Sequence, residues 1–220
     1  MKNIILQHWT GELGPLELAS KANMEKYAKQ CGAEYQLILG NQFHPKLHGC
    51  YQKLIMLDKR FDKYQDTLMV DLDMFVVKDV KDNVFDVPGV GLNSKVQKDI
   101  FKAMCKGKKY RSVTDRNGPF WGGAFWKFTN DQRKQLRKLI VDKELKIFNK
   151  NFNDEGAIHR LATLAGLKQI DVPEEWCWGN CFPGYENAKM IHIRHKFKYV
   201  GPKVPKLEVY EALKKEGIFE

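Results

Sequence analysis

Hydrophobic residues in the first third of the chain follow two spacings, one typical of strands and one typical of helices. Short apolar runs are separated by longer stretches in which apolar residues recur at helical intervals. These segments predict strands at 3–9, 34–39 and 66–72 and helices at 14–32 and 45–64. Pro15 and Gly32 stand where proline and glycine commonly mark a helix start and end. The βαβαβ order predicts an open, largely parallel sheet with helices on both faces.

The remainder of the chain continues the same alternation without an internal repeat or a low-complexity linker. Further strands are expected at 89–94, 120–129 and 188–195, and further helices at 130–145, 153–166 and 206–217. The chain has 220 residues, which suits one sizeable domain better than two. We therefore expect a single α/β domain over 1–220 with a Rossmann-like, mixed but mostly parallel sheet.

The distribution of apolar residues indicates a protein that does not span a membrane and is not secreted by the usual route. No apolar stretch is long enough to cross a bilayer, and the apolar run at the N-terminus is too short for a signal peptide. The five cysteines are scattered without a CxxC pair, which argues against a zinc ribbon and fits a reducing compartment. The expectation is a soluble, cytoplasmic protein. Whether it is one domain of a longer chain stays open.

The formal net charge of +10 favours anionic ligands: nucleic acid, an acidic membrane or a phosphorylated substrate. Basic residues cluster at 106–111, 133–138 and 194–199. The lysines are spread over the chain and, taken together, show neither the basic helix nor the sustained basic-aromatic alternation that nucleic-acid binding would require. A nucleic-acid-binding module is therefore the weaker interpretation.

Two aspartates end the apolar run of the third expected strand. Asp71 and Asp73 have one residue between them, so on a strand both side chains point the same way and Leu72 points to the other face. They lie at the carboxyl end of the strand, where open α/β sheets bind ligands. Two carboxylates aimed at one point repel each other unless a cation lies between them, and Mg²⁺ or Mn²⁺ commonly joins carboxylates to substrate phosphates. The pattern predicts a site for a metal-bound diphosphate. The alternative is that one aspartate caps a turn and the other is exposed to solvent.

With this motif the chain resembles the metal-dependent GT-A glycosyltransferases, most of all the retaining enzymes of the galactosyltransferase and glycogenin type. In that family a tyrosine, any residue, arginine and leucine precede the apolar strand that ends in DxD. Here "YQKL" places Lys53 where the family has the arginine. The resemblance implies that Lys53 contacts the donor sugar, that Asp71 contacts ribose and metal, and that Asp73 chelates the metal.

The family's third metal ligand is a histidine on a late strand, followed six residues later by a lysine that binds the diphosphate. "MIHIRHKFK" places His192 and Lys198 at that spacing. Imidazole suits Mn²⁺ better than Mg²⁺. The family's glycine-lysine-proline-tryptophan pattern is not reproduced here, so Arg194 or Lys196 is an alternative to the lysine. His195 is the rival metal ligand, with odd spacing that turns it to the other face of a strand.

Further binding residues follow from the family order. Gly122 and Gly123 lie where the family has a small loop that approaches the donor sugar, and Asp154 and Glu155 lie where it has an aspartate followed by glutamine at a helix start. The resemblance assigns donor-sugar contact to Asp154 and a place near the anomeric carbon to Glu155. The alternatives are a strand bulge for the glycines and ordinary helix capping for the acids.

The end of the first expected strand is where the family binds the nucleotide. His8, Trp9 and Thr10 stand there, and an aromatic ring stacked on uracil is one role for Trp9, core packing the other. Trp176 and Trp178 lie in a later loop, where they either stack on an acceptor sugar or pack internally. The family order therefore divides the domain into a nucleotide-binding part over about 1–95 and a part that binds the acceptor and the sugar over about 96–200.

The resemblance implies an Mn²⁺-dependent (or Mg²⁺-dependent), retaining hexosyltransferase that uses a UDP-sugar donor and a glycan or glycoprotein acceptor. The chain is also similar to the N-terminal glycosyltransferase domains of multidomain chlorella-virus proteins, which implies a viral enzyme in the host cytoplasm and glucose or rhamnose as the sugar. Two alternatives remain: an inactive relative that only binds, and a haloacid-dehalogenase-type phosphatase. The phosphatase carries its DxD after the first strand with threonine or valine two residues on, where this chain has Phe75.

Overall fold

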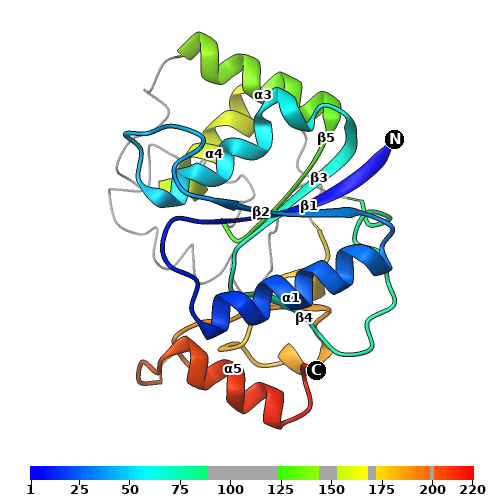
Figure 1. Cartoon of the computed structure of the whole chain (residues 1–220), viewed down its shortest axis with the longest axis vertical. Coiled ribbons are helices and arrows are strands. Elements are labelled where there is room, and N and C mark those ends of the chain that lie inside the picture. Colours follow the sequence, from blue (N-terminus) through cyan, green and yellow to red (C-terminus); the bar gives the residue numbers. More distant parts are fainter. Residues whose placement is uncertain (89–122, 144–152, 168–171, 199–200) are drawn as a thin grey trace.

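A mixed β-sheet flanked by helices forms the centre of the molecule (Figure 1). The computed structural model describes residues 1–88, 123–143, 153–167, 172–198 and 201–220, and every structural statement below concerns these residues. Within them the main sheet consists of β1 (Lys2–Trp9), β2 (Glu34–Leu39), β3 (Tyr64–Val70) and β5 (Phe125–Thr129), in the order β2-β1-β3-β5. β1 pairs in parallel with β2 and β3, and β5 runs antiparallel to β3. The expected open, mostly parallel sheet is confirmed.

A smaller sheet lies beyond the end of β3. In the described part of the chain it contains β4 (Met74–Val76), β6 (Trp178–Gly179) and β7 (Met190–His192), in the order β4-β7-β6. β4 follows β3 after a short turn and pairs antiparallel with β7, so that Met74 lies opposite His192. This pairing brings a late part of the chain beside the DxD turn.

Helices cover both faces of the main sheet. The α-helices are α1 (Pro15–Gln30), α3 (Asn130–Lys143), α4 (Asn153–Leu164) and α5 (Lys206–Lys215). The 3₁₀ helices are η1 (Gly49–Leu57), η2 (Lys59–Phe61), η5 (Glu174–Trp176) and η6 (Tyr185–Asn187). Figure 1 shows α3 and α4 on one side of the main sheet and α1 on the other, with α5 beyond α1 and β4.

Alternation along the strands explains the two cores. Ile4 and Leu6 of β1 point into a cluster with η1, α3 and α4, whereas Ile5 points into a cluster with α1. Since both faces of β1 are buried, its sequence is a nearly continuous apolar run and not an alternating one. The carboxyl ends of β1 and β3 are thereby fixed side by side at one edge of the sheet.

The helix expected at 45–64 is not a single α-helix. It consists of η1 and η2 with a break at Asp58, which has extended backbone angles and whose side chain accepts a hydrogen bond from the Arg60 backbone N–H. Every residue from 51 to 57 is buried, including Gln52 and Lys53. A helix that buries only one face cannot bury seven consecutive residues. The apolar residues at 45–64 therefore predicted burial correctly, but the prediction of an α-helix was wrong.

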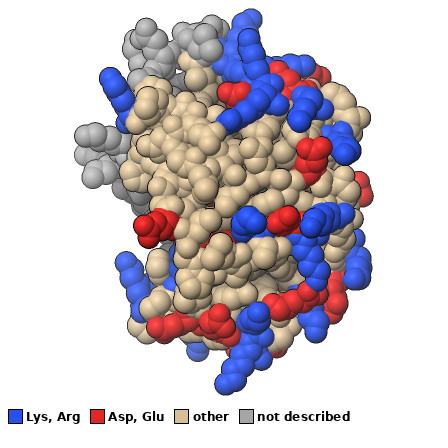
Figure 2. Space-filling view, in the orientation of Figure 1, with Lys and Arg blue, Asp and Glu red and all other residues tan. Residues whose placement is uncertain are grey.

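Several expectations fall outside the described residues: the strand at 89–94, the boundary near residue 95 and Gly122. The strand expected at 120–129 begins at Phe125, and the one at 188–195 is confined to Met190–His192. Among the described helices none combines the length and hydropathy needed to cross a membrane. On the face in Figure 2, basic and acidic side chains are interspersed instead of forming one basic stripe.

Candidate active site

A cavity of about 340 Å³ opens at the carboxyl ends of β1 and β3. Its lining contains most of the residues predicted from sequence: His8, Trp9, Thr10, Lys53, Asp71, Asp73, Gly123, Asp154, Glu155 and His192. They come from β1, η1, the turn after β3, the segment before β5, the start of α4 and the end of β7. Cavities at this edge are the usual ligand sites of open α/β sheets.

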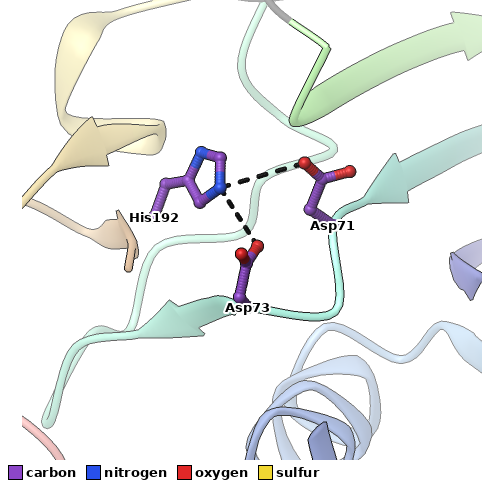
Figure 3. A group of neighbouring side chains, drawn as sticks. All are labelled: Asp71, Asp73 and His192. Carbon is purple, nitrogen blue, oxygen red and sulfur yellow. Dashed lines mark ion pairs between the residues drawn. The ribbon is translucent and has the colours of Figure 1, made fainter. Parts of the chain in front are cut away.

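Asp71 and Asp73 lie in a turn and not on the strand. β3 ends at Val70, and the Met74 N–H donates to the Asp71 carbonyl to close the turn. Leu72 is buried, and the two aspartates converge on His192 at the end of β7, as Figure 3 shows. The two carboxylates do point toward the same place, as expected from sequence. The cause is the turn after β3, and not the alternation of side chains along a strand.

The three side chains form a compact group of metal-ligand types. His192 Nε2 lies 3.0 Å from Asp73 Oδ1 and 3.9 Å from Asp71 Oδ2, and one ligand atom from each residue lies within 4.8 Å of the others. Burial, reinforced by Arg194, lowers the pKa of His192, which keeps the imidazole neutral and able to ligate near neutral pH. Asp73 Oδ1 is buried and has no hydrogen-bond partner among the described residues.

These properties fit a divalent cation. A buried carboxylate oxygen without a donor is costly unless a cation or proton joins it. Burial alone would raise the pKa of Asp73, but His192 and Lys206 outweigh burial and hold that pKa below its ordinary value. Two carboxylates and one imidazole suit Mn²⁺ or Mg²⁺, so Asp71, Asp73 and His192 are the residues that would hold the ion.

Lys53 connects the aspartate pair to α4. Its buried ammonium lies 2.5 Å from Asp71 Oδ1, from Asp154 Oδ2 and from the Gly123 carbonyl oxygen. Burial alone would lower the pKa of Lys53, but Asp154 and Asp71 outweigh it and raise the pKa above its ordinary value. All three hydrogens of the ammonium thus have protein acceptors. The contact between Lys53 and a donor sugar stays a prediction.

Asp154 and Glu155 stand in the first turn of α4 and face the same cavity. Burial raises the pKa of both carboxyls, opposed at Asp154 by Lys53 and reinforced at Glu155 by Asp154. Glu155 Oε1 accepts a hydrogen bond from the Gly123 N–H at 3.3 Å. A Cβ at Gly123 would lie 2.7 Å from Asp154 Oδ2 and 2.8 Å from Glu155 Cγ. Glycine is therefore required there for the approach of α4, whether or not a sugar also approaches.

The predicted nucleotide residues line the cavity at the end of β1. His8 is buried, and its Nε2 lies 2.8 Å from the Gly40 carbonyl oxygen; burial lowers its pKa. The Trp9 indole N–H donates to the Glu12 carbonyl, and Thr10 is exposed. Because the indole N–H is already satisfied, the free surface of Trp9 is apolar and suits stacking.

The segment after β7 differs from the predicted arrangement. Lys198 is exposed and is not among the residues lining the cavity, whereas Arg194 is. The Arg194 N–H donates to Asn180 Oδ1, and Asn180 Nδ2 donates to the Lys196 carbonyl, so a buried asparagine fixes this segment. His195 is exposed and lies outside the group formed with Asp71 and Asp73.

Some residues of the site were not anticipated from sequence. His48, Gly49 and Cys50 line the cavity, and burial raises the pKa of the Cys50 thiol to about 11, so it is not a thiolate near neutral pH. Lys206 of α5 forms an ion pair with Asp73 Oδ2. No local motif marks these residues. Of the two tryptophans considered for an acceptor, Trp176 is fully buried and Trp178 is partly exposed.

Comparison with known proteins identifies the fold and nothing finer. No family model matches the sequence, and no curated protein matches it. Among solved structures, the chain is similar to a glycosyltransferase involved in the glycosylation of the major capsid of PBCV-1. The two share 10% sequence identity at a TM-score of 0.61, over 97% of this chain and 100% of the other. The chain therefore has a glycosyltransferase-like α/β fold.

Proposed function

We propose that this chain is a metal-dependent glycosyltransferase that moves a hexose or deoxyhexose, glucose or rhamnose, from a UDP-sugar to a glycan or glycoprotein acceptor. The observation that carries the proposal is the convergence of Asp71, Asp73 and His192 in one cavity that two further acids also line. The fold shared with a glycosyltransferase supports it. The cytoplasmic location, a viral origin and any further domains rest on the sequence resemblance alone.

The proposed metal site accounts for how an acidic cavity accepts a diphosphate. When bound, a divalent ion supplies positive charge that neutralises the diphosphate of the donor and of the leaving nucleotide. Asp71, Asp73 and His192 would hold that ion, and the imidazole favours Mn²⁺ over Mg²⁺. Arg194 lines the same cavity and supplies a second positive charge for the diphosphate. Lys198 keeps the predicted role only if a donor draws its segment inward.

The remaining residues suit the rest of the donor. His8, Trp9 and Thr10 lie at the end of β1, where the base and ribose would bind, and α4 presents Asp154 and Glu155 on the sugar side. Asp154 is already held by Lys53, which leaves it oriented to accept hydrogen bonds from sugar hydroxyls. Glu155 is the acid free of an ion pair in the described part of the cavity wall, and it is the group proposed to stabilise positive charge at the anomeric carbon.

We propose retention of configuration at the anomeric carbon. An inverting enzyme needs a general base on the face of the sugar opposite the leaving group. In a front-face reaction the leaving phosphate accepts the acceptor's proton, and a nearby carboxylate stabilises the oxocarbenium-like state. Glu155, half-buried and held by the Gly123 N–H, suits that electrostatic role better than it suits proton abstraction from an exposed acceptor.

Binding and turnover measured across UDP- and GDP-sugars, with and without Mn²⁺, test the proposal. UDP should raise the melting temperature only when Mn²⁺ is present, and Asp73→Ala should abolish that increase while leaving the fold intact. Equal UDP binding by the variant, or by the wild type in excess chelator, would contradict the metal site. Sugar-nucleotide binding without any transfer would favour the inactive relative, and phosphate release from simple phosphomonoesters would favour the phosphatase.

A further inference from the structure

Each aspartate of the proposed metal site is held by a lysine on the oxygen turned away from His192. Asp71 contacts Lys53 through Oδ1 and has Oδ2 toward His192. Asp73 contacts Lys206 through Oδ2 and has Oδ1 toward His192. The two lysines come from opposite sides of the turn, one from η1 and one from α5. In both carboxylates one oxygen is thus occupied and the other is directed to the point where the three ligand groups meet.

The position of Lys206 is fixed by packing that involves the DxD segment itself. Lys206 is the first residue of α5, and Tyr210, one turn later, stacks on Phe75 with ring centroids 4.6 Å apart. Phe75 belongs to β4, which begins immediately after Asp73. Phe219, beyond the helix, contacts both rings, at 5.1 Å from Phe75 and 5.6 Å from Tyr210. The aromatic cluster therefore sets the distance between the start of α5 and the aspartate turn.

We propose that Lys206 is a positioning residue of the metal site, which holds Asp73 by its outer oxygen so that the inner oxygen faces the cation. This inference rests on the proposed function, because it assumes that Asp71, Asp73 and His192 bind a divalent ion. Groups that bind a ligand residue from behind commonly change metal affinity by about 10–100-fold when they are removed. Lys206 would do for Asp73 what Lys53 does for Asp71.

The competing interpretation is that Lys206 occupies the place of the ion and leaves when the ion binds. The assignment of oxygens argues against it, because Lys206 is on Oδ2 whereas the unpartnered atom near His192 is Oδ1. A lysine that substituted for the ion would contact the oxygens that face His192. The two interpretations predict opposite signs: removal of Lys206 weakens metal binding if it positions Asp73, and strengthens binding if it competes.

The substitution Lys206→Met removes the ammonium and keeps most of the stem. The side chain of Lys206 is 27% exposed, against 9% for Lys53, so the variant should fold. Lys206→Arg retains a cationic donor, and Lys215→Met is the matched control, an exposed lysine in the last turn of the same helix. Melting temperatures in excess chelator report any effect on folding separately from metal binding.

Mn²⁺ affinity, measured on the full chain by the loss of the free Mn²⁺ signal in electron paramagnetic resonance, decides the matter. We expect Lys206→Met to bind Mn²⁺ about tenfold more weakly, Lys206→Arg to stay within about threefold of the wild type, and Lys215→Met to be unchanged. Unchanged or tighter binding by Lys206→Met overturns the positioning role, as does equal loss in Lys206→Arg. Failure of the wild type to bind Mn²⁺ overturns the proposed metal site as well, so the two failures are distinguishable.

Discussion

Replacing Lys53 with methionine is the most direct test of how the buried acids of the cavity are held. Lys53 donates to Asp71, to Asp154 and to the Gly123 carbonyl, each at 2.5 Å. Methionine keeps an apolar stem of similar length and removes only the charged, donating end. The variant leaves Asp154, whose exposure is 7%, without its cation.

The expected cost follows from that burial. Removing one partner of a buried ion pair typically destabilises a protein by about 3–5 kcal/mol, because the other charge remains desolvated. Asp71 is more exposed than Asp154 and can be hydrated, so most of the loss comes from Asp154. We therefore expect the free energy of unfolding to fall by about 3 kcal/mol near neutral pH, at the lower end of that range.

The pH dependence of the destabilisation by Lys53→Met provides a second, independent test. Burial opposes the charge on Lys53, but Asp154 and Asp71 raise its pKa in the folded state above the unfolded value. Its contribution is therefore complete below the unfolded pKa and is lost only as pH rises through the folded pKa, well above neutrality. In the variant Asp154 lacks its cation, and its pKa, which burial already raises, rises further. The destabilisation should shrink as pH falls, because a protonated Asp154 no longer buries a charge.

Urea unfolding followed by tryptophan fluorescence measures these quantities. The set comprises the wild type, Lys53→Met, Asp154→Asn, the double variant and Lys59→Met as an exposed-lysine control. The double variant should recover at least half of the loss of Lys53→Met, since it removes the orphaned charge. An unfolding midpoint for Lys53→Met equal to that of the wild type, or a loss that grows toward acid pH, would refute the reasoning.

The remaining predictions concern the proposed chemistry. His192→Ala should weaken Mn²⁺ binding and sugar transfer together, while His195→Ala changes Mn²⁺ affinity less than twofold; calorimetric titration checks both, and the reverse order of damage would mean that the wrong histidine was chosen. Glu155→Gln should lower turnover by about a hundredfold with UDP-sugar binding nearly unchanged, as for other lost transition-state contacts. Because burial raises the pKa of Glu155 and the ionised form is needed, wild-type turnover should fall on the acid side at a pH above the ordinary glutamate pKa. NMR of the product's anomeric centre tests retention, and near-normal turnover of Glu155→Gln would move the role to Asp154 or to a group on the acceptor side.

Residues near the carboxyl ends of the strands were predictable from sequence because apolar runs locate the strands, although the strand ends themselves differ from those expected. The apolar run before Asp71 located β3, and parallel pairing with β1 then fixed the edge at which both strands end. His192 followed from the resemblance to the GT-A family, which has a histidine on a late strand, and its position opposite Met74 in the pairing of β4 with β7 explains why it meets the aspartates. The aspartates thus followed from a local pattern and one topological rule, whereas His192 required the family resemblance; together they are the three residues that converge in the cavity.

Residues whose position depends on distant contacts were not predictable in this way. Counting from His192 selects Lys198, but the side chain of Asn180 fixes the backbone at Arg194 and Lys196, and Arg194 is the residue that lines the cavity. Lys206 lies 133 positions from Asp73, and only the packing of α5 on β4 brings them together. Neither contact has a spacing that a single sequence can reveal.

The balance of charge around the cavity explains how such a site can fold before a metal arrives. Each carboxylate there has a basic group near it. Asp71 and Asp154 both form ion pairs with Lys53, Asp73 forms one with Lys206, and the charge of Arg194 acts on Glu155. Four carboxylates therefore face three basic side chains among the described residues, which leaves at most one uncompensated negative charge. A divalent ion would reverse that sign to a single positive charge. Under the proposed function, an acidic, metal-free cavity would repel the diphosphate of a donor and a metal-loaded cavity would attract it, so the lysines that stabilise the metal-free site would also make donor binding depend on the ion.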